Sequence, residues 1–127
     1  MLATLRRDGS PRVSGTELIF AEGKLWLGSM AGAVKARDLL RDPRFALHGG
    51  TEDPPAWTGD VKVAGRAVDI GDAAVLARVV GDHRPADPMQ LFRAELGEVT
   101  IVWVDEAAVQ LVVESWHPGR GVEIVRR

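Results

Sequence analysis

Tight-turn sequences near the start of the chain restrict the fold more than any other feature. An Asp-Gly pair at 8–9 follows a short apolar run at 2–5, and such a pair between apolar runs predicts a β-hairpin. A Glu-Gly-Lys turn at 22–24 separates a predicted strand at 12–21 from another at 25–29. This part of the chain therefore predicts a meander of antiparallel strands.

The rest of the chain predicts two short helices and several further strands. A helix over 31–41 ends where Asp42 precedes Pro43, because the residue before proline is pushed out of the helical region. A long strand over 61–70 contains Gly65, which predicts a β-bulge or a close backbone approach. The remaining predicted elements are a strand at 44–50, a loop at 51–55, a helix at 73–80 between Asp72 and Gly81, an irregular segment at 82–88, a helical turn at 89–92, strands at 98–104 and 108–115, and a tail in which 122–125 is compatible with a short strand.

Six or seven antiparallel strands with two short helices indicate a mainly β fold. This pattern fits a small closed barrel better than a two-layer α/β sheet. The length of 127 residues fits one domain, and no repeat or composition shift marks a boundary. We therefore expect a single domain over 1–127.

Composition excludes several kinds of chemistry. The chain has no Cys, no Tyr and three His, which excludes disulfides, thiol nucleophiles and tyrosine acid–base chemistry. Its formal charge of −2 argues against a dedicated nucleic-acid binder, which carries a basic excess. No apolar run reaches the roughly 18 residues of a membrane helix, and the first residues lack the order of a signal peptide. We expect a cytoplasmic protein that binds no nucleic acid and no membrane.

The histidines and tryptophans favour structural roles. His48, His83 and His117 lack the spacing of metal ligands, so no metal site is expected. Trp26 and Trp103 lie in strand patterns and are expected in the core. The remaining candidate, Trp116, covers a bound ring or seals the barrel end, and the second alternative is favoured because large aromatic side chains usually bury area first.

The stretch around the first predicted helix offers an anion site. A predicted strand ends at Ser29, and the helix begins near Gly32 with Lys35 in its first turns. A helix N-terminus has free N–H groups and a partial positive charge, which favour an anion such as phosphate. Arg12, on a neighbouring strand, can add a bidentate contact. The alternative is that Lys35 and Arg37 belong to a solvated helix face, and the spacing alone favours that alternative.

Four stretches of the sequence, taken together and in their order along the chain, form a pattern that is specific enough to indicate a family. They are RRDGSPRV at 6–13, GKLWL at 23–27, KARDLLRDPR at 35–44 and VAGRA at 63–67. In this order they resemble the pyridoxamine 5′-phosphate oxidase-like family, whose members are flavin and deazaflavin oxidoreductases of the FMN-binding split-barrel type. The resemblance covers about 2–70 well and the remainder in outline. It implies an antiparallel, six- to seven-stranded split β-barrel.

The resemblance also implies a homodimer with two cofactor sites at the subunit interface, which bind FMN or the deazaflavin coenzyme F-420. Lys35 matches the family lysine that holds the cofactor phosphate, and Ser29 matches a hydroxyl residue that also contacts it. Arg12 and the two residues after it match residues that line the cofactor, and Trp57 matches positions that reach the partner's site. The cofactor-binding residues predicted in this way, with Arg37 as a supplement, are Arg12, Val13, Ser14, Ser29, Lys35, Arg37 and Trp57.

The sequence departs from the family pattern in three places. Ala33 and Val34 stand where many relatives have a second basic residue, so Arg37 supplements the phosphate site or the site suits another cofactor. The sequence begins in its predicted first strand, without the N-terminal helix usual in relatives, so either the start is truncated or that helix is dispensable here. The Arg and His motif of the pyridoxal-binding tail is not recognisable, which argues against vitamin B6 oxidation.

These features together predict an FMN- or deazaflavin-dependent oxidoreductase that acts on a small molecule. No catalytic side chain is expected, because such cofactors carry out the chemistry themselves. One alternative is a non-catalytic flavin-binding carrier or sensor. Another is a structural module whose cofactor site has decayed.

Overall fold

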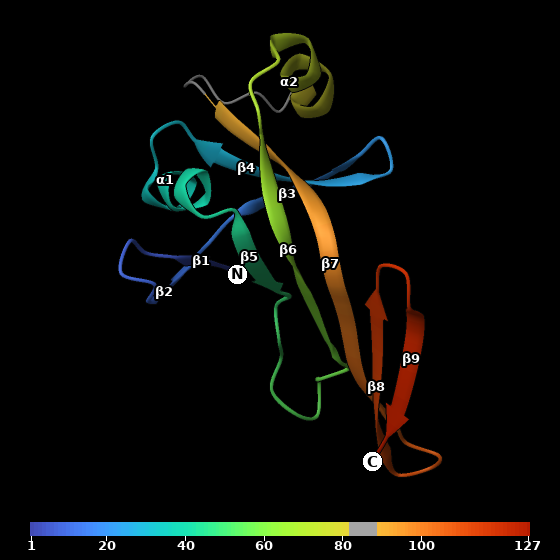
Figure 1. Ribbon diagram of the computed structural model, residues 1–127. Helices are drawn as coiled ribbons and strands as arrows, with labels where there is room; N and C mark the ends of the chain where they lie inside the picture. Colours follow the sequence, from blue (N-terminus) through green and yellow to red (C-terminus); the bar gives the residue numbers. More distant parts are fainter. Residues whose placement is uncertain (82–88) are drawn as a thin grey trace.

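The computed structural model describes residues 1–81 and 89–127, and within them the chain forms nine β-strands and two α-helices (Figure 1). In chain order these are β1 (Leu2–Leu5), β2 (Pro11–Ser14), β3 (Glu17–Ala21), β4 (Lys24–Met30), α1 (Val34–Arg41), β5 (Arg44–His48), β6 (Asp60–Ile70), α2 (Ala73–Val80), β7 (Met89–Asp105), β8 (Gln110–His117) and β9 (Gly121–Arg126). Neither helix is long and apolar enough to cross a membrane. The predicted irregular segment 82–88, with His83, lies outside the described residues.

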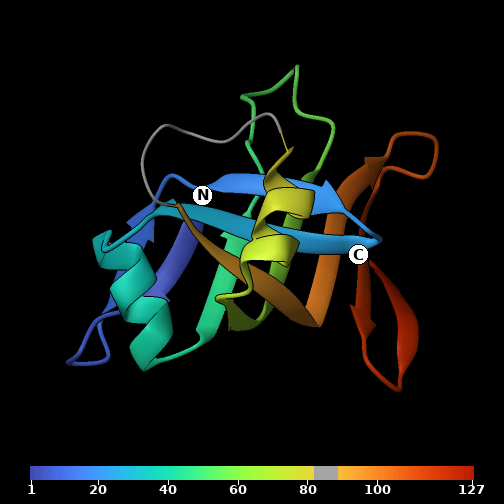
Figure 2. The same ribbon diagram turned by 90° about the horizontal axis from the view of Figure 1, so that it is seen from above.

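The strands form one antiparallel sheet, in the order β2-β1-β5-β6-β7-β4-β3. The two end strands, β2 and β3, follow each other in the chain and are joined only by Gly15 and Thr16. The path therefore returns to its start, as in a barrel that is split between β2 and β3. β8 pairs with β7 and β9 with β8, and this hairpin lies away from α1 (Figure 2). The predicted mainly β, antiparallel class is confirmed.

The long strands β6 and β7 form the centre of the sheet. They pair along the whole of β6, with a register shift between Ala64 and Gly65. A Cβ atom at Gly65 would collide with the carbonyl oxygen of Glu95 on β7, so this approach requires glycine. The predicted bulge and close approach at Gly65 are confirmed.

Two predicted elements differ from the structure. The single strand predicted at 12–21 is divided, because β2 pairs with β1 whereas β3 pairs with β4. The helical turn predicted at 89–92 is wrong, since these residues begin β7 and pair with β4, which buries Leu91 and Phe92. The division of 12–21, together with the segment at 122–125, which forms the longer strand β9, raises the number of strands from six or seven to nine.

Two apolar clusters form the core. Trp26 belongs to the cluster beneath α2; it is 2% exposed and its Nε1 donates to the Ala21 carbonyl oxygen at 2.9 Å, so its predicted core role is confirmed. Trp103 is only half-buried and belongs to neither cluster, so its predicted core role is wrong; its Nε1 donates to Glu114 Oε1 at 3.2 Å. The buried residues of the larger cluster are Leu2, Leu25, Leu27, Ala36, Leu39, Phe45, Leu47, Ala67 and Phe92.

The two helices agree with the sequence to different degrees. α2 has the predicted bounds, with Asp72 at its N-terminus. α1 begins at Val34 rather than at 31, because Gly32 has a φ of +75° that a helix does not allow. The sequence pattern predicts Val34, Leu39 and Leu40 on the buried face of this helix and Asp38 away from it. In the structure Leu40 is 53% exposed whereas Asp38 is buried. The position of Asp38 shapes the candidate site.

Candidate functional site

The N-terminus of α1 has no cap. Ala33 occupies the cap position, no side chain of the described residues accepts from this end, and the first turn contains no acidic residue. The N–H groups of Val34, Lys35 and Ala36 have no acceptor within the helix. These groups and the helix dipole favour a negative charge at this end of α1.

A cleft of about 230 Å³, here called the Lys35 cleft, lies beside this helix end. Lys35 Nζ donates to the Gly15 carbonyl oxygen at 2.6 Å, and Ser29 Oγ donates to the Met30 carbonyl oxygen at 3.1 Å. Ser29 is 8% exposed. The structure thus brings two predicted phosphate ligands to one cleft. Its lining residues are Glu17, Gly28, Ser29, Met30, Ala33, Lys35 and Met89.

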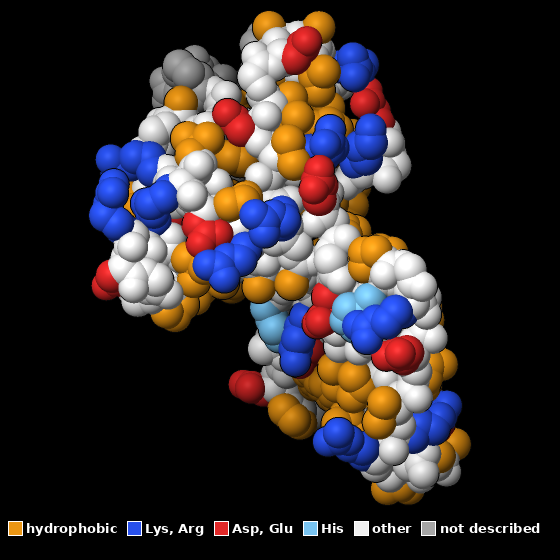
Figure 3. All heavy atoms as spheres, in the orientation of Figure 1, with side chains coloured by type: hydrophobic (Ala, Val, Ile, Leu, Met, Phe, Trp, Pro, Cys, Tyr) orange, Lys and Arg blue, Asp and Glu red, His pale blue; other side chains and the backbone are white. Residues whose placement is uncertain are grey.

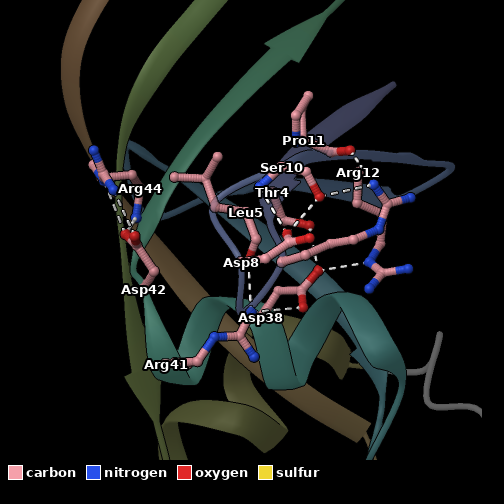
Figure 4. Close-up of polar contacts among 11 residues, drawn as sticks. Thr4, Leu5, Asp8, Ser10, Pro11, Arg12, Asp38, Arg41, Asp42 and Arg44 are labelled. Carbon is pink, nitrogen blue, oxygen red and sulfur yellow. Dashed lines mark hydrogen bonds and ion pairs between the residues drawn. The ribbon is translucent and has the colours of Figure 1, made fainter.

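Two other predicted ligands, Arg12 and Arg37, line a different hollow. This arginine groove, of about 800 Å³, lies between the β1–β2 turn and α1. Arg12 Nε donates to Asp38 Oδ2 at 2.6 Å and so points toward the helix (Figure 4). The lining of the groove shares no residue with that of the Lys35 cleft. The lining residues are Arg6, Arg7, Asp8, Arg12, Val34, Arg37, Asp38, Leu40 and Arg41.

Asp38 organises this groove from inside the protein. It is 2% exposed and accepts from Thr4 Oγ1 at 2.9 Å and from an Arg41 Nη at 3.0 Å, in addition to Arg12. Burial raises the pKa of Asp38, but the hydrogen bonds from Arg12, Arg41 and Thr4 outweigh this effect and hold the pKa below its usual value. The sequence pattern places Asp38 off the apolar face of this helix, so its burial was not predicted. The sequence signal for a buried polar partner was Thr4, a polar residue on the core side of an apolar strand.

Val13 and Ser14, predicted to meet the cofactor ring, lie on β2. Val13 is 62% exposed and lines a trough of about 310 Å³ on the outer face of the sheet. We call it the alanine trough, because its lining contains Ala3, Ala46 and Ala64, which pair with one another across the neighbouring strands β1, β5 and β6. Ser14 is half-buried and pairs with β1 through its main chain. Besides Val13 and the three alanines, the lining of the trough contains Met1, Leu47, His48, Lys62, Val63 and Glu98.

Trp57 lies apart from the other predicted residues. It lines a concavity of about 500 Å³ in the β5–β6 loop. Its Nε1 donates to Asp60 Oδ1 at 3.1 Å, and this hydrogen bond is the largest of several effects that lower the pKa of Asp60. Within one chain, the seven predicted residues are therefore distributed over several separate hollows.

The described histidines each have a polar neighbour. His48 Nδ1 lies 2.6 Å from the Gly49 carbonyl oxygen, which agrees with a structural role. His117 Nε2 lies 3.0 Å from Glu98 Oε2, a partner that the sequence did not predict. Within residues 1–81 and 89–127, no three His, Asp or Glu side chains gather as a metal site requires. Trp116 is half-buried on β8, and its two predicted alternatives stay predictions.

Comparison with known families gives one match over most of the chain. The family model described as Pyridoxamine 5′-phosphate oxidase matches residues 1–111. This range contains the Lys35 cleft, the arginine groove, the alanine trough and Trp57. No curated protein sequence matches the chain.

Solved structures share the fold at low sequence identity. PhzG from Burkholderia lata 383, in complex with tetrahydrophenazine-1-carboxylic acid, is 12% identical with a TM-score of 0.68 over 99% of this chain and 79% of that one. A pyridoxamine 5′-phosphate oxidase-related, FMN-binding protein from Nostoc punctiforme is 13% identical, with a TM-score of 0.66 over 99% and 84%. The Agrobacterium tumefaciens protein Atu2129, of unknown function, is 23% identical with a TM-score of 0.62; the match covers 79% of this chain but only 48% of that protein. The predicted split-barrel fold is confirmed.

Proposed function

We propose, on the premise that this chain belongs to the pyridoxamine 5′-phosphate oxidase family, that it binds FMN and acts in the cytoplasm as an oxidoreductase on a small molecule. The observation that carries the proposal is the Lys35 cleft, which lies within the matched residues and at the uncapped end of α1. The similarity to the FMN-binding protein of Nostoc punctiforme supports the choice of cofactor. We also propose that residues 1–127 form a single domain.

The Lys35 cleft fits the phosphate of a flavin. Lys35 supplies a positive charge, Ser29 supplies a hydroxyl, and the first turn of α1 supplies main-chain N–H groups. A lysine ammonium has three donors, so Lys35 can keep its contact with Gly15 while it binds an anion. We assign Arg12 and Arg37 a supporting role through their positive charge rather than through direct contact, because both line the arginine groove, which shares no lining residue with the Lys35 cleft.

A flavin, when bound, supplies hydride and electron transfer through its ring. The part of the protein is to hold this ring and to keep water from it. We propose that Val13 and Ser14 meet the ring through their main chain at the alanine trough. The row of three alanines in this trough suits a flat aromatic system, since these small side chains allow close contact with a ring.

We propose that the working form is a homodimer. Large apolar side chains are exposed at the trough and on the C-terminal strands; Figure 3 shows apolar atoms over β7, β8 and β9. Contiguous exposed apolar surface marks an interface in a monomer of this size. In such a dimer, Trp57 of one protomer is proposed to reach the cofactor of the other. The exposed apolar residues that support this assignment are Met1, Val13, Val61, Ile101, Val104, Leu111, Val122, Ile124 and Val125.

The alternative cofactor is the deazaflavin coenzyme F-420. Ala33 and Val34 leave the helix end without a second basic residue beside Lys35, so the phosphate site differs from the pattern of many relatives. A site of different shape is compatible with a different phosphate-bearing cofactor. FMN remains our first choice because a structural relative binds it.

A non-catalytic carrier or sensor is the second candidate function. The observation that favours it is the composition of the chain, which has no Cys, no Tyr and three His. Few side chains are therefore able to supply a nucleophile, acid or base for turnover. The oxidoreductase remains the first candidate, because the bound ring carries the reaction.

Two measurements separate these functions. The visible spectrum of the purified protein, followed by calorimetric titration of the cofactor-free protein with FMN and with F-420, identifies the cofactor. Steady-state assays with reduced nicotinamide nucleotides and a panel of acceptors then test turnover. Binding with turnover above that of the free cofactor supports the oxidoreductase, and binding without it supports the carrier. Failure to bind either cofactor contradicts both.

A further inference from the structure

The arginine groove has a lining that the Lys35 cleft does not explain. Five arginines and two aspartates surround a volume of about 800 Å³, against about 230 Å³ for the Lys35 cleft. The chain as a whole has a formal charge of −2, so this positive surface does not follow from a basic composition. Figure 3 shows Lys and Arg side chains gathered over α1. Such a concentration of like charge requires an explanation.

Part of this charge is neutralised within the protein. Asp38 pairs with Arg12 at 2.6 Å and with Arg41 at 3.0 Å. Asp8 lies close enough to Arg6 that the charge of Arg6 contributes to lowering the pKa of Asp8, after the larger effect of the hydrogen bonds from Ser10. Two aspartates thus offset two of the five guanidinium charges, and two of the arginines have neither aspartate as a partner.

These two arginines are Arg7, in the β1–β2 turn, and Arg37, on α1. Both are exposed, and neither side chain makes a hydrogen bond or an ion pair within residues 1–81 and 89–127. They line the same groove from its two walls. Their guanidinium groups are available to a ligand without the loss of any contact within the described residues.

Other arginines of the groove are already oriented. Arg12 uses its Nε for Asp38, which leaves both of its Nη groups free of Asp38. One Nη of Arg41 contacts both the Leu5 carbonyl oxygen at 2.6 Å and Asp38, and an Nη of Arg6 donates to the Pro11 carbonyl oxygen at 2.6 Å. Figure 4 shows Asp38, Arg12 and Arg41 converging between the β1–β2 hairpin and α1. Because these arginine side chains are already held in place, they would lose little conformational freedom when a ligand binds.

We propose that the arginine groove is a second anion site, which binds a small molecule or a segment of one that carries two or more neighbouring negative charges. Guanidinium groups bind phosphate and carboxylate oxygens in pairs, so the ligand is a diphosphate or an oligocarboxylate. The inference goes beyond the proposed function, because it does not require a flavin and involves residues outside the Lys35 cleft.

Calorimetric titration of the full chain with inorganic pyrophosphate, and separately with citrate, tests the site and distinguishes the two chemistries. We expect one of them to bind saturably at the groove, with affinity that falls as salt is added, since exposed charges are screened. The double variant Arg7→Gln/Arg37→Gln should weaken this binding by about tenfold or more, because it removes two charge-assisted contacts. Arg120→Gln is the matched control, an exposed arginine in the β8–β9 turn whose loss should change affinity by less than about twofold.

The outcomes separate this site from the cofactor site. Saturable binding that the groove variant weakens and the control does not, with the same pyrophosphate or citrate affinity in the presence of FMN, supports the proposal. Absence of saturable binding by both probes, or an equal loss in the control, overturns it. Competition between the probe and FMN also overturns it, because the groove then belongs to the cofactor site. A protein that fails to bind FMN can still pass this test, so the two proposals fail separately.

Discussion

The two helices have the same length of eight residues but differ at their N-termini. At α2, Asp72 Oδ1 accepts from the N–H groups of Ala74 at 2.8 Å and Val75 at 3.0 Å. At α1 the cap position is Ala33, no side chain in the described part of the chain accepts from the helix end, and Lys35 lies in the first turn. N–H groups at a helix end require acceptors. At α2 the Asp72 side chain is that acceptor, whereas at α1 the N–H groups are available to an external anion.

The two helices also differ in the residues that they bury. α2 buries Val79 and Val80 against the cluster that contains Trp26, and it packs as an ordinary amphipathic helix. α1 buries Leu39, but it also buries the carboxylate of Asp38, which holds arginines at the surface. Helix α1, whose buried face contains a carboxylate, is thus the helix that contributes residues to both candidate anion sites.

Removal of the buried carboxylate on α1 should have the largest effect. Asp38→Ala leaves Arg12 and Arg41 without their partner and Thr4 without its acceptor, so we expect the free energy of unfolding to fall by about 3 kcal/mol. Chemical denaturation measures this change. Asp53→Ala, in the exposed β5–β6 loop, is the control and should stay within about 0.5 kcal/mol of the original protein. Equal losses in the two variants would contradict the role of Asp38.

A second variant gives α1 the cap of α2. In Ala33→Asp the carboxylate should accept from the first-turn N–H groups and raise the free energy of unfolding by about 0.5–1 kcal/mol. The same carboxylate should weaken FMN binding by about tenfold, because it occupies those groups and repels a phosphate. Ala33→Ser caps without a charge and should weaken binding less. Unchanged FMN affinity in Ala33→Asp contradicts phosphate binding at this end.

The reverse change removes the cap of α2. Asp72→Ala leaves the N–H groups of Ala74 and Val75 without their acceptor and should lower the free energy of unfolding by about 1 kcal/mol. FMN affinity should not change, because α2 lines neither the Lys35 cleft nor the arginine groove. Denaturation and FMN titration of the same preparation measure both effects. Weaker FMN binding in this variant would remove the functional distinction between the helices.

The smallest expected effect is on the pH dependence of stability and concerns the C-terminal ends of the two helices. α1 ends at Asp42, whose pKa the hydrogen bonds from Arg44 lower from 3.8 to about 2, whereas α2 ends at Gly81, which does not titrate. A lowered pKa means that ionised Asp42 stabilises the fold above about pH 4, and that this contribution is lost as the pH falls toward about 2. Unfolding at about pH 5 and about pH 2.5 should show a smaller acid-induced loss in Asp42→Asn than in the original protein. An identical loss would contradict this assignment.

The turns and the caps of this fold could be predicted because their signals are local. The Asp-Gly turn at 8–9, the cap at Asp72 and the bulge at Gly65 each depend on a few neighbouring residues. The first residues of β7 could not be predicted, because the apolar run at 89–92 suits a helix or a strand and only its pairing with β4 decides. The division of 12–21 into two strands also depends on distant partners.

The same reasoning applies to the site. Ser29 and Lys35 lie close together in the sequence and in a family pattern, so their meeting in one cleft could be predicted. Asp38 could not, because a charged residue on an amphipathic helix normally faces water. Its burial becomes favourable only when Arg12 and Thr4 arrive from β2 and β1.

The most direct test of phosphate binding at α1 compares two ligands that differ only in their phosphate. FMN and riboflavin are titrated against the original protein, Lys35→Ala and the control Lys24→Ala, an exposed lysine at the start of β4. We expect the original protein and the control to prefer FMN by about tenfold or more, since a charge-assisted contact to phosphate contributes roughly 1.5–3 kcal/mol. In Lys35→Ala this preference should fall toward equality, with riboflavin affinity unchanged. An equal preference for FMN in all three proteins would contradict the account.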